Sequence, residues 1–149
     1  MNEILSTVLI VVLTFVCVIA IYRLLAGYYP GSKFIIEDPP IANNGLEAGQ
    51  AKFMFFYTSW CPWSKKAFKP WNSFKQKVRN ESATYGGKSI IFVQIDAEAD
   101  KGQAALYNIK EFPTFKLETA NKVYTLQAIP DPATFEAFLT GTLGQKVTH

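Results

Sequence analysis

Near its N-terminus the chain carries a long stretch without a single charged residue. Residues 4–22 are apolar apart from a few small polar side chains, and Glu3 and Arg23 bound them. A helix of this length is roughly 28 Å long, which matches the hydrocarbon thickness of a bilayer. The sequence therefore predicts one membrane-spanning helix through residues 4–22, with residues 1–25 as an anchor and a separate domain after it.

A cleaved signal peptide is the alternative for this stretch. Signal peptides start with basic residues and have apolar cores of about 7 to 15 residues, whereas this chain starts Met-Asn-Glu and its apolar run is longer. Arg23 and Lys33 follow the run, and basic residues favour the cytosolic side of a membrane helix. We expect a single-pass membrane protein with its soluble domain on the cytosolic side, a lumenal domain being the alternative.

The composition excludes several classes of site. The 149 residues are 49% hydrophobic and 15% aromatic, which is too apolar for a disordered chain. With two cysteines and a single histidine at the last position, neither a disulfide scaffold nor a zinc cluster of three or four Cys/His ligands is expected. Because His149 is terminal, Ser/His/Asp catalysis is not expected either. We expect no metal and no resident cofactor.

After the anchor, strand and helix patterns alternate as in an α/β domain. A tether of residues 26–50 is rich in glycine, proline and asparagine, with a candidate strand at 34–36, and the domain follows at 51–149. The continuously apolar runs 52–58 and 89–95 predict strands buried on both faces of a sheet with parallel pairing. The other predicted elements are helices at 64–80, 100–108 and 132–141, the last two capped by Asp100 and Asp131, and a hairpin of strands 114–117 and 123–126.

Cys61 is the candidate reactive group. It stands where the strand 52–58 turns into the lysine-rich helix, so the helix dipole, the Ser64 hydroxyl and nearby Lys65 and Lys66 are expected to lower its pKa. A thiolate in that position attacks disulfides. The alternative is a buried and inert cysteine, against which the flanking residues argue: Trp60, Pro62 and Trp63.

From about residue 51 to residue 139 the chain resembles the thioredoxin fold superfamily, including its protein disulfide isomerase-like members. The runs FMFFYTSWCPWSKK, IIFVQIDAEAD and NIKEFPTFKL occur in that order, followed by a hairpin and an Asp-Pro-capped helix. The resemblance implies a central mixed sheet flanked by helices. It also implies that Trp60–Ser64 is the active-site WCxxC and that Pro113, 52 residues after Cys61, is the family's cis-proline.

The same resemblance assigns roles to the residues around Cys61. Cys61 is expected to be the nucleophile, Ser64 to stabilise its thiolate and Pro113 to shape a docking groove. An extended client would add its backbone along residues 112–114, with 127–129 on the far side of the groove. The expected client-contacting residues are Trp60, Pro62, Trp63, Phe112 and Thr114.

Three departures from the family decide what the site can do. Ser64 replaces the second cysteine, giving a CxxS motif in which nothing resolves a mixed disulfide, so a two-electron dithiol cycle is excluded. Phe55 stands where the family has a buried proton-accepting acid. The family's opening strand and helix are hard to find in residues 33–50. Superfamily members with CxxS hold client thiols by mixed disulfides, isomerise disulfides with an external thiol, or have lost redox chemistry.

The charge distribution adds a candidate partner surface. Residues 65–88 carry seven basic residues and one acid, although the net charge is only +3. A solvated face is the simplest interpretation, and anionic lipid or an acidic protein is the functional alternative. No nucleic-acid partner is expected, since no binding motif accompanies the charge. The basic residues are Lys65, Lys66, Lys69, Lys75, Lys77, Arg79 and Lys88.

Two functions remain open on the sequence. The first is a membrane-anchored monothiol protein that forms mixed disulfides with protein clients carrying thiols or disulfides, with an external thiol such as glutathione for release. It would be an oxidoreductase or isomerase without a resolving cysteine. The second is a redox-silent structural or docking module that links a membrane to a protein assembly, such as a minor virus-particle protein. The lost cysteine and acid favour the second, and the retained Trp60, Cys61 and Pro113 favour the first.

Overall fold

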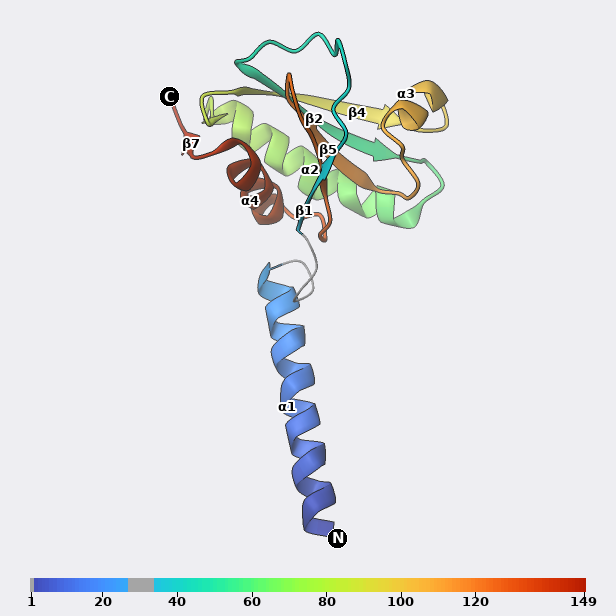
Figure 1. Cartoon of the computed structure of the whole chain (residues 1–149), viewed down its shortest axis with the longest axis vertical. Helices are drawn as coiled ribbons and strands as arrows, with labels where there is room; N and C mark the ends of the chain where they lie inside the picture. Colours follow the sequence, from blue (N-terminus) through green and yellow to red (C-terminus); the bar gives the residue numbers. More distant parts are fainter. Residues whose placement is uncertain (1, 27–33) are drawn as a thin grey trace.

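A computed structural model of the chain shows a long N-terminal helix, α1 (Asn2–Ala26), and an α/β unit (Figure 1). It describes residues 2–26 and 34–149. Lys33, on which the predicted orientation partly rests, and the other residues between 26 and 34 lie outside these ranges. The α/β class and the mixed sheet flanked by helices are confirmed.

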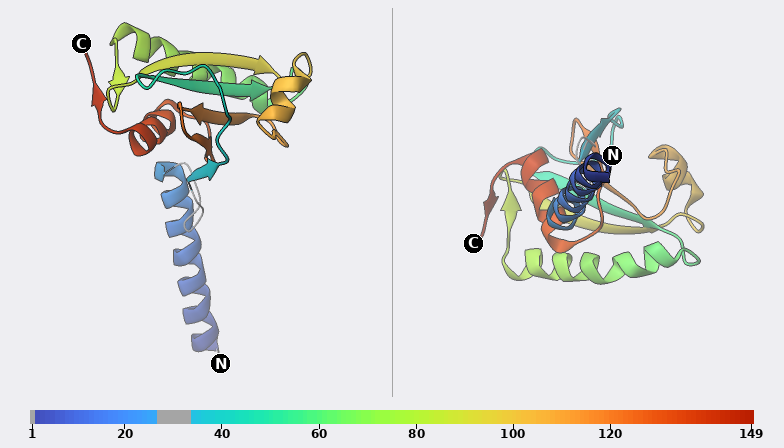
Figure 2. Two further views of the ribbon diagram at one scale, coloured as in Figure 1. Left: turned by 45° about the horizontal axis from the view of Figure 1, so that its top comes forward. Right: turned by 90° about the horizontal axis from the view of Figure 1, so that it is seen from below.

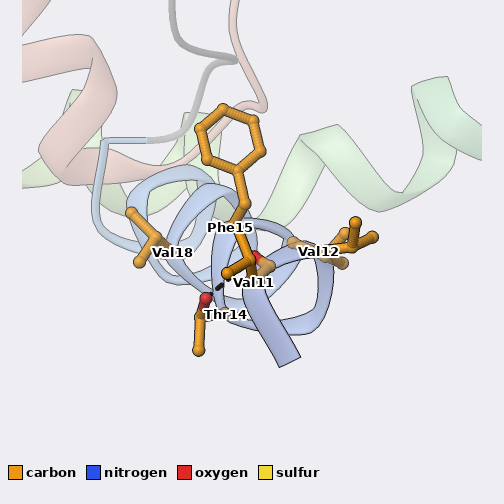
Figure 3. Close-up of a pocket in the computed structure, with 6 residues that line it drawn as sticks. Val11, Val12, Thr14, Phe15 and Val18 are labelled. Atoms are coloured by element: carbon orange, nitrogen blue, oxygen red, sulfur yellow. Dashed lines mark hydrogen bonds between the residues drawn. The ribbon is translucent and has the colours of Figure 1, made fainter. Parts of the chain in front are cut away.

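Helix α1 is long and apolar enough to cross a membrane. Residues Glu3–Leu25 have a mean hydropathy of 3.1, and none of this stretch is buried. A signal sequence has the same properties. The shallow recess among Val11, Phe15 and Val18 is lined by α1 alone, and these side chains project outward from the helix (Figure 3). We therefore assign it to the apolar surface of α1.

The sheet has five strands in the order β1-β6-β5-β2-β4. Strands β2 and β4 pair in parallel, and the remaining neighbours are antiparallel. A small second sheet joins β3 and β7 near the C-terminus. The bounds are β1 Ile35–Asp38, β2 Gln50–Tyr57, β3 Thr84–Tyr85, β4 Ser89–Asp96, β5 Thr114–Glu118, β6 Val123–Leu126 and β7 Lys146–Val147.

Two helices cover one face of the sheet, and a short one lies on the other. Helices α2 (Pro62–Asn80) and α4 (Pro132–Leu143) pack on the first face, and α2 runs alongside β4 (Figure 2). Helix α3 (Lys101–Leu106) leads into Tyr107, which packs on the second face. As predicted, the Asp100 and Asp131 side chains cap α3 and α4, accepting hydrogen bonds from backbone N–H groups at 2.9 and 2.8 Å.

The face under α2 and α4 is packed with aromatic rings. Phe53 lies at its centre, with ring centroids 4.9 Å from Trp71, 6.4 Å from Phe74 and 5.5 Å from Phe135. All four side chains are fully buried. This aromatic face gives the domain most of its apolar burial.

The opposite face carries a buried polar network. Glu118, with no exposed surface, accepts hydrogen bonds from Lys52 at 2.9 Å, Tyr107 at 2.6 Å and Asn44 at 3.1 Å. Lys116 donates to Asp38 at 2.9 Å. We call this side the polar face; its buried charges are paired, as burial requires.

Two predictions about the sheet differ from the structure. Strand β2 is buried as expected, but β4 has exposed residues at Ser89, Ile91 and Gln94, because within the described part of the chain it pairs with β2 alone and forms an edge. The candidate strand predicted at 34–36 is confirmed as β1, which lies inside the predicted tether and pairs with β6 at the opposite edge of the sheet. The sheet therefore begins earlier in the chain than the boundary expected at Ala51.

Candidate functional site

Cys61 lies at the junction of β2 and α2. The turn after Tyr57 closes with a hydrogen bond from the Cys61 N–H to the Thr58 carbonyl, at 3.4 Å. Cys61 has extended backbone angles and is the N-cap of α2, with exposed Pro62 as the first helical residue. A proline suits that position, since its missing N–H would have no partner in the first turn. The first amides of α2 therefore surround the sulfur.

Strand pairing brings the cis-proline segment to the same place. The Phe112–Pro113 peptide bond is cis, and β5 starts directly after it with Thr114 paired to Phe56 near the end of β2. The Cys61 thiol donates a hydrogen bond to the carbonyl oxygen of Phe112, with a sulfur–oxygen distance of 3.5 Å. Cys61 and the predicted proline loop are thus neighbours.

The surroundings of the sulfur favour the thiolate. A hydrogen bond from the Ser64 backbone N–H lowers the pKa of Cys61, and burial opposes that shift. The Ser64 hydroxyl and the Trp63 N–H also lower the pKa. The net pKa is below the ordinary thiol value. Ser64 lowers the pKa of Cys61 as predicted. The other lowering contribution comes from a backbone amide of α2, and not from Lys65 and Lys66 as expected.

Ser64 is held by the turn that carries Cys61. Its side chain is fully buried, and its hydroxyl oxygen accepts a hydrogen bond from the Thr58 N–H at 3.4 Å. The Thr58 hydroxyl is buried and lacks a hydrogen-bond partner among the described residues. Thr58 is not among the residues predicted for the site. The sequence feature that could have indicated it is its position three residues before Cys61, the N-cap of α2.

Two exposed tryptophans flank a nearly buried thiol. Cys61 keeps 6% of its surface, while Trp60 and Trp63 keep 62% and 67%. The Trp60 indole N–H donates to Glu98 at 3.0 Å, a contact the sequence did not predict. The ammonium of Lys66 lies 4.8 Å from the centre of the Trp63 ring. The exposed rings offer apolar contact area at residues next to Cys61 in the chain.

Among residues 2–26 and 34–149, no buried carboxylate lies on the aromatic face beneath the sulfur. Phe55, in the position expected for the family's acid, is fully buried and stacks on Phe115 with ring centroids 4.9 Å apart. Phe68 and Trp71 enclose the same ring. The Phe55 ring has no group that can accept a proton from Cys61.

Thr114 and the segment 127–129, which were also predicted for the site, form hydrogen bonds with residues other than Cys61. Thr114 donates from its hydroxyl to the Glu111 carbonyl at 2.6 Å, which fixes the turn around Pro113. In the segment 127–129, the Gln127 N–H is bonded to the Phe34 carbonyl at 3.0 Å, and Ile129 is exposed. Within residues 2–26 and 34–149 there is no group of three or more metal-ligating side chains.

Comparisons with known proteins agree with this geometry. No curated protein sequence matches the chain significantly. Among solved structures, human ERp44 in its zinc-bound form has a TM-score of 0.54 at 15% identity, covering 63% of this chain and 27% of that one. The first two thioredoxin domains of Naumovozyma dairenensis Eps1p give 0.54 at 18% identity, with coverages of 68% and 39%. Thioredoxin of Fasciola hepatica gives 0.50 at 15%, with coverages of 62% and 81%.

These identities show a shared fold and nothing finer. The chain spans little more than a quarter of ERp44 and about two fifths of the Eps1p fragment. The sequence profile described as Thioredoxin, in contrast, matches residues 44–140, which is more than half of the chain. Strands β2, β4, β5 and β6, the thiol at the N-terminus of α2 and the cis-proline beside it lie within that range. The chain therefore belongs to the thioredoxin family.

Proposed function

We propose that this protein is a membrane-anchored monothiol member of the thioredoxin family that forms mixed disulfides with protein clients through Cys61. The observation that carries the proposal is the position of the sulfur, at the first turn of α2 and 3.5 Å from the Phe112 carbonyl oxygen. Ser64 stands three residues further on, and the other cysteine, Cys17, belongs to α1. A client bound at Cys61 therefore meets one thiol.

The proposed reaction is a thiol–disulfide exchange. The Cys61 thiolate attacks one sulfur of a client disulfide, whose S–S bond breaks as the mixed disulfide forms, and the other client sulfur leaves as a thiolate. Release follows when that client thiolate, or an external thiolate such as glutathione, attacks the mixed disulfide and displaces the Cys61 thiolate. Isomerisation needs no net oxidant, and release by glutathione leaves the client bonded to glutathione.

The residues around Cys61 would position the client. The Phe112 carbonyl and the cis Pro113 border the sulfur, so a client strand laid along 112–114 would present its sulfur to Cys61. Exposed Trp60 and Trp63, with Pro62 between Cys61 and Trp63, supply apolar contact area for its side chains.

The proposal places α1 in a membrane as a single-pass anchor. Its length and mean hydropathy of 3.1 support a span. Arg23, which follows the uncharged run, supports a cytosolic domain by the positive-inside rule. The exposed lysines of α2, including Lys65 and Lys69, suit an anionic partner, either lipid headgroups or an acidic protein.

A second candidate function is a redox-silent docking module between a membrane and a protein assembly, such as a virus particle. Two observations favour it: Cys61 keeps only 6% of its surface, and Phe55 replaces the buried acid. In that case Cys61 is an inherited packing residue. The same experiment separates the two functions.

The test is to trap adducts of the full chain in its own membranes by rapid alkylation and to separate them on non-reducing gels. We expect adducts that dithiothreitol removes, that Cys61→Ser abolishes and that the matched control Cys17→Ser retains. Ser64→Cys should reduce them, because the new thiol lies near enough to resolve the mixed disulfide. Adducts that persist in Cys61→Ser would contradict the proposal.

The docking module makes the opposite prediction. With it, no adducts appear, Cys61→Ser leaves association with the assembly unchanged, and deletion of residues 1–25 abolishes that association. This pattern would replace the monothiol function with the structural one.

A further inference from the structure

The outer edge of β4 is unpaired. Among the described residues β4 pairs with β2 alone and is the last strand of the sheet, visible at its border in Figure 2. The N–H groups of Ser89 and Ala97 point toward β2, at 3.0 Å from the Gly49 carbonyl and 2.9 Å from that of Tyr57. Since backbone groups alternate sides along a strand, the even-numbered residues of β4 turn their N–H groups outward.

The edge lacks the usual protection against strand pairing. Exposed edges are commonly blocked by proline, bulges or inward charges. Residues 89–96 contain no proline, their register with β2 runs without interruption, and their one charged side chain, Asp96, comes at the end. Ile91, with 39% of its surface exposed, stands beside this edge. The backbone of β4 is therefore available to an added strand.

One side of the edge is bordered by cations of α2. The Gln94 side chain donates to Asn72 at 3.3 Å, which identifies the flank of α2 that faces β4. Residues three and seven positions from Asn72 lie on the same flank, and these are Lys65, Lys69, Lys75 and Arg79. None of the four takes part in an ion pair among the described residues, whereas Lys77 is bonded to Glu136 of α4 at 2.7 Å. We call Lys65, Lys69, Lys75 and Arg79 the basic flank.

The other side of the edge is bordered by a groove on the polar face with a mixed lining. Met54, Val93 and Ile95 form its apolar part, Lys52, Asp96 and Asp100 form its charged part, and its volume is about 410 Å³. Side chains of an added strand alternate between the two faces of the sheet. One set would meet the basic flank, and the other set would meet Ile91, Val93 and the groove.

We propose that the β4 edge binds an extended segment of a partner protein in which acidic and apolar residues alternate. The segment adds a sixth strand to the sheet, its carboxylates facing Lys75 and Arg79 and its apolar side chains facing Ile91 and Val93. Charge complementarity selects this occupant over a second copy of the chain, because two copies paired through β4 would bring their basic flanks together. This surface is separate from Cys61.

The test uses the full chain in phosphatidylcholine nanodiscs and a synthetic peptide of alternating glutamate and valine. Binding is followed by fluorescence anisotropy, and strand addition by NMR-detected hydrogen exchange of the amides of Ile90, Phe92 and Gln94. We expect binding at micromolar to millimolar concentration with protection of all three amides. A lysine–valine peptide of the same pattern should not bind.

Two sets of variants locate the contact. Gln94→Pro removes one outward N–H and should weaken binding at least about fivefold relative to Gln94→Ala, which loses the same bond to Asn72. Lys75→Glu with Arg79→Glu should weaken it at least about tenfold, while Lys66→Glu with Lys110→Glu, of equal charge change, should not. If Gln94→Pro does not fold, the charge variants decide.

Three outcomes overturn the proposal. The first is the absence of peptide binding, or binding without protection of the three amides. The second is binding to phosphatidylserine vesicles in the absence of any peptide binding. If Lys75→Glu with Arg79→Glu abolishes this vesicle binding and Gln94→Pro leaves it intact, the basic flank is a lipid-binding surface. The third is protection of the β4 amides through dimerisation in the absence of peptide, which would make the edge a contact between copies.

Discussion

The two faces of the sheet are stabilised in different ways. Cys61, the N-cap of α2, lies on the side of the aromatic face. The aromatic face buries Phe53, Phe55 and Trp71 against one another. The polar face holds Glu118, the one fully buried carboxylate among the described residues, in a network with Lys52 and Tyr107. The buried acid is thus on the side away from α2 and engaged in structure. This contrast explains why the thiol depends on helix amides for its low pKa.

The largest effect is expected on the aromatic face. Trp71→Ala removes a fully buried side chain that contacts Phe53, Phe55 and Phe92, and should cost about 3–5 kcal/mol of unfolding free energy. Urea unfolding of the full chain in detergent, followed by circular dichroism, measures it. Trp63→Ala, which removes an exposed ring, is the control and should cost less than about 0.5 kcal/mol. Equal losses would mean that this face is not the main source of stability.

A smaller loss is expected on the polar face. Glu118→Gln keeps the shape but removes the charge that Lys52 and Tyr107 bind, and should cost about 2–3 kcal/mol by the same unfolding measurement. Lys52 is about a quarter exposed and can return to water, which limits the penalty. Glu37→Gln, on an exposed pair with Lys122, is the control and should be nearly neutral. A neutral Glu118→Gln would show that the network adds no stability.

The smallest loss of unfolding free energy is expected when one hydrogen bond of the polar face is removed. Tyr107→Phe removes the hydroxyl that donates to Glu118 at 2.6 Å and leaves the ring packed on Phe56. The expected cost is about 1 kcal/mol, since Lys52 and Asn44 still bind the carboxylate. Alkylation of Cys61 should be unchanged, because Tyr107 lies on the other face. A changed alkylation profile would mean that the two faces are coupled.

Local patterns in the sequence predicted the elements but not all of their neighbours. The apolar runs, the helical stripe and the aspartate caps each depend on a few adjacent residues, so β2, α2 and the caps of α3 and α4 could be predicted. The pairing of β1 with β6 joins Ile35 to Leu126, which no local pattern encodes. The exposed edge of β4 was missed because a continuous apolar run is typical of a central strand.

The candidate site, like the fold, could be predicted from the sequence only in part. The spacing of Cys61 and Pro113 and the resemblance to the family placed both at one site, and the 3.5 Å contact to Phe112 agrees with that. The contacts of Thr58 with Ser64 and of Trp60 with Glu98 depend on the turn and on the loop after β4. Such contacts follow from three-dimensional packing and carry no motif of their own.

The alkylation rate of Cys61 against pH, measured with iodoacetamide on the full chain carrying Cys17→Ser, tests the central claim most directly. Because the helix amides favour the thiolate, the pKa is lowered, and the thiolate fraction should be lost only as the pH falls through a midpoint below the ordinary value of about 8.5. We predict such a midpoint, together with full labelling under native conditions. A midpoint at or above about 8.5, or labelling that requires unfolding, would contradict the account.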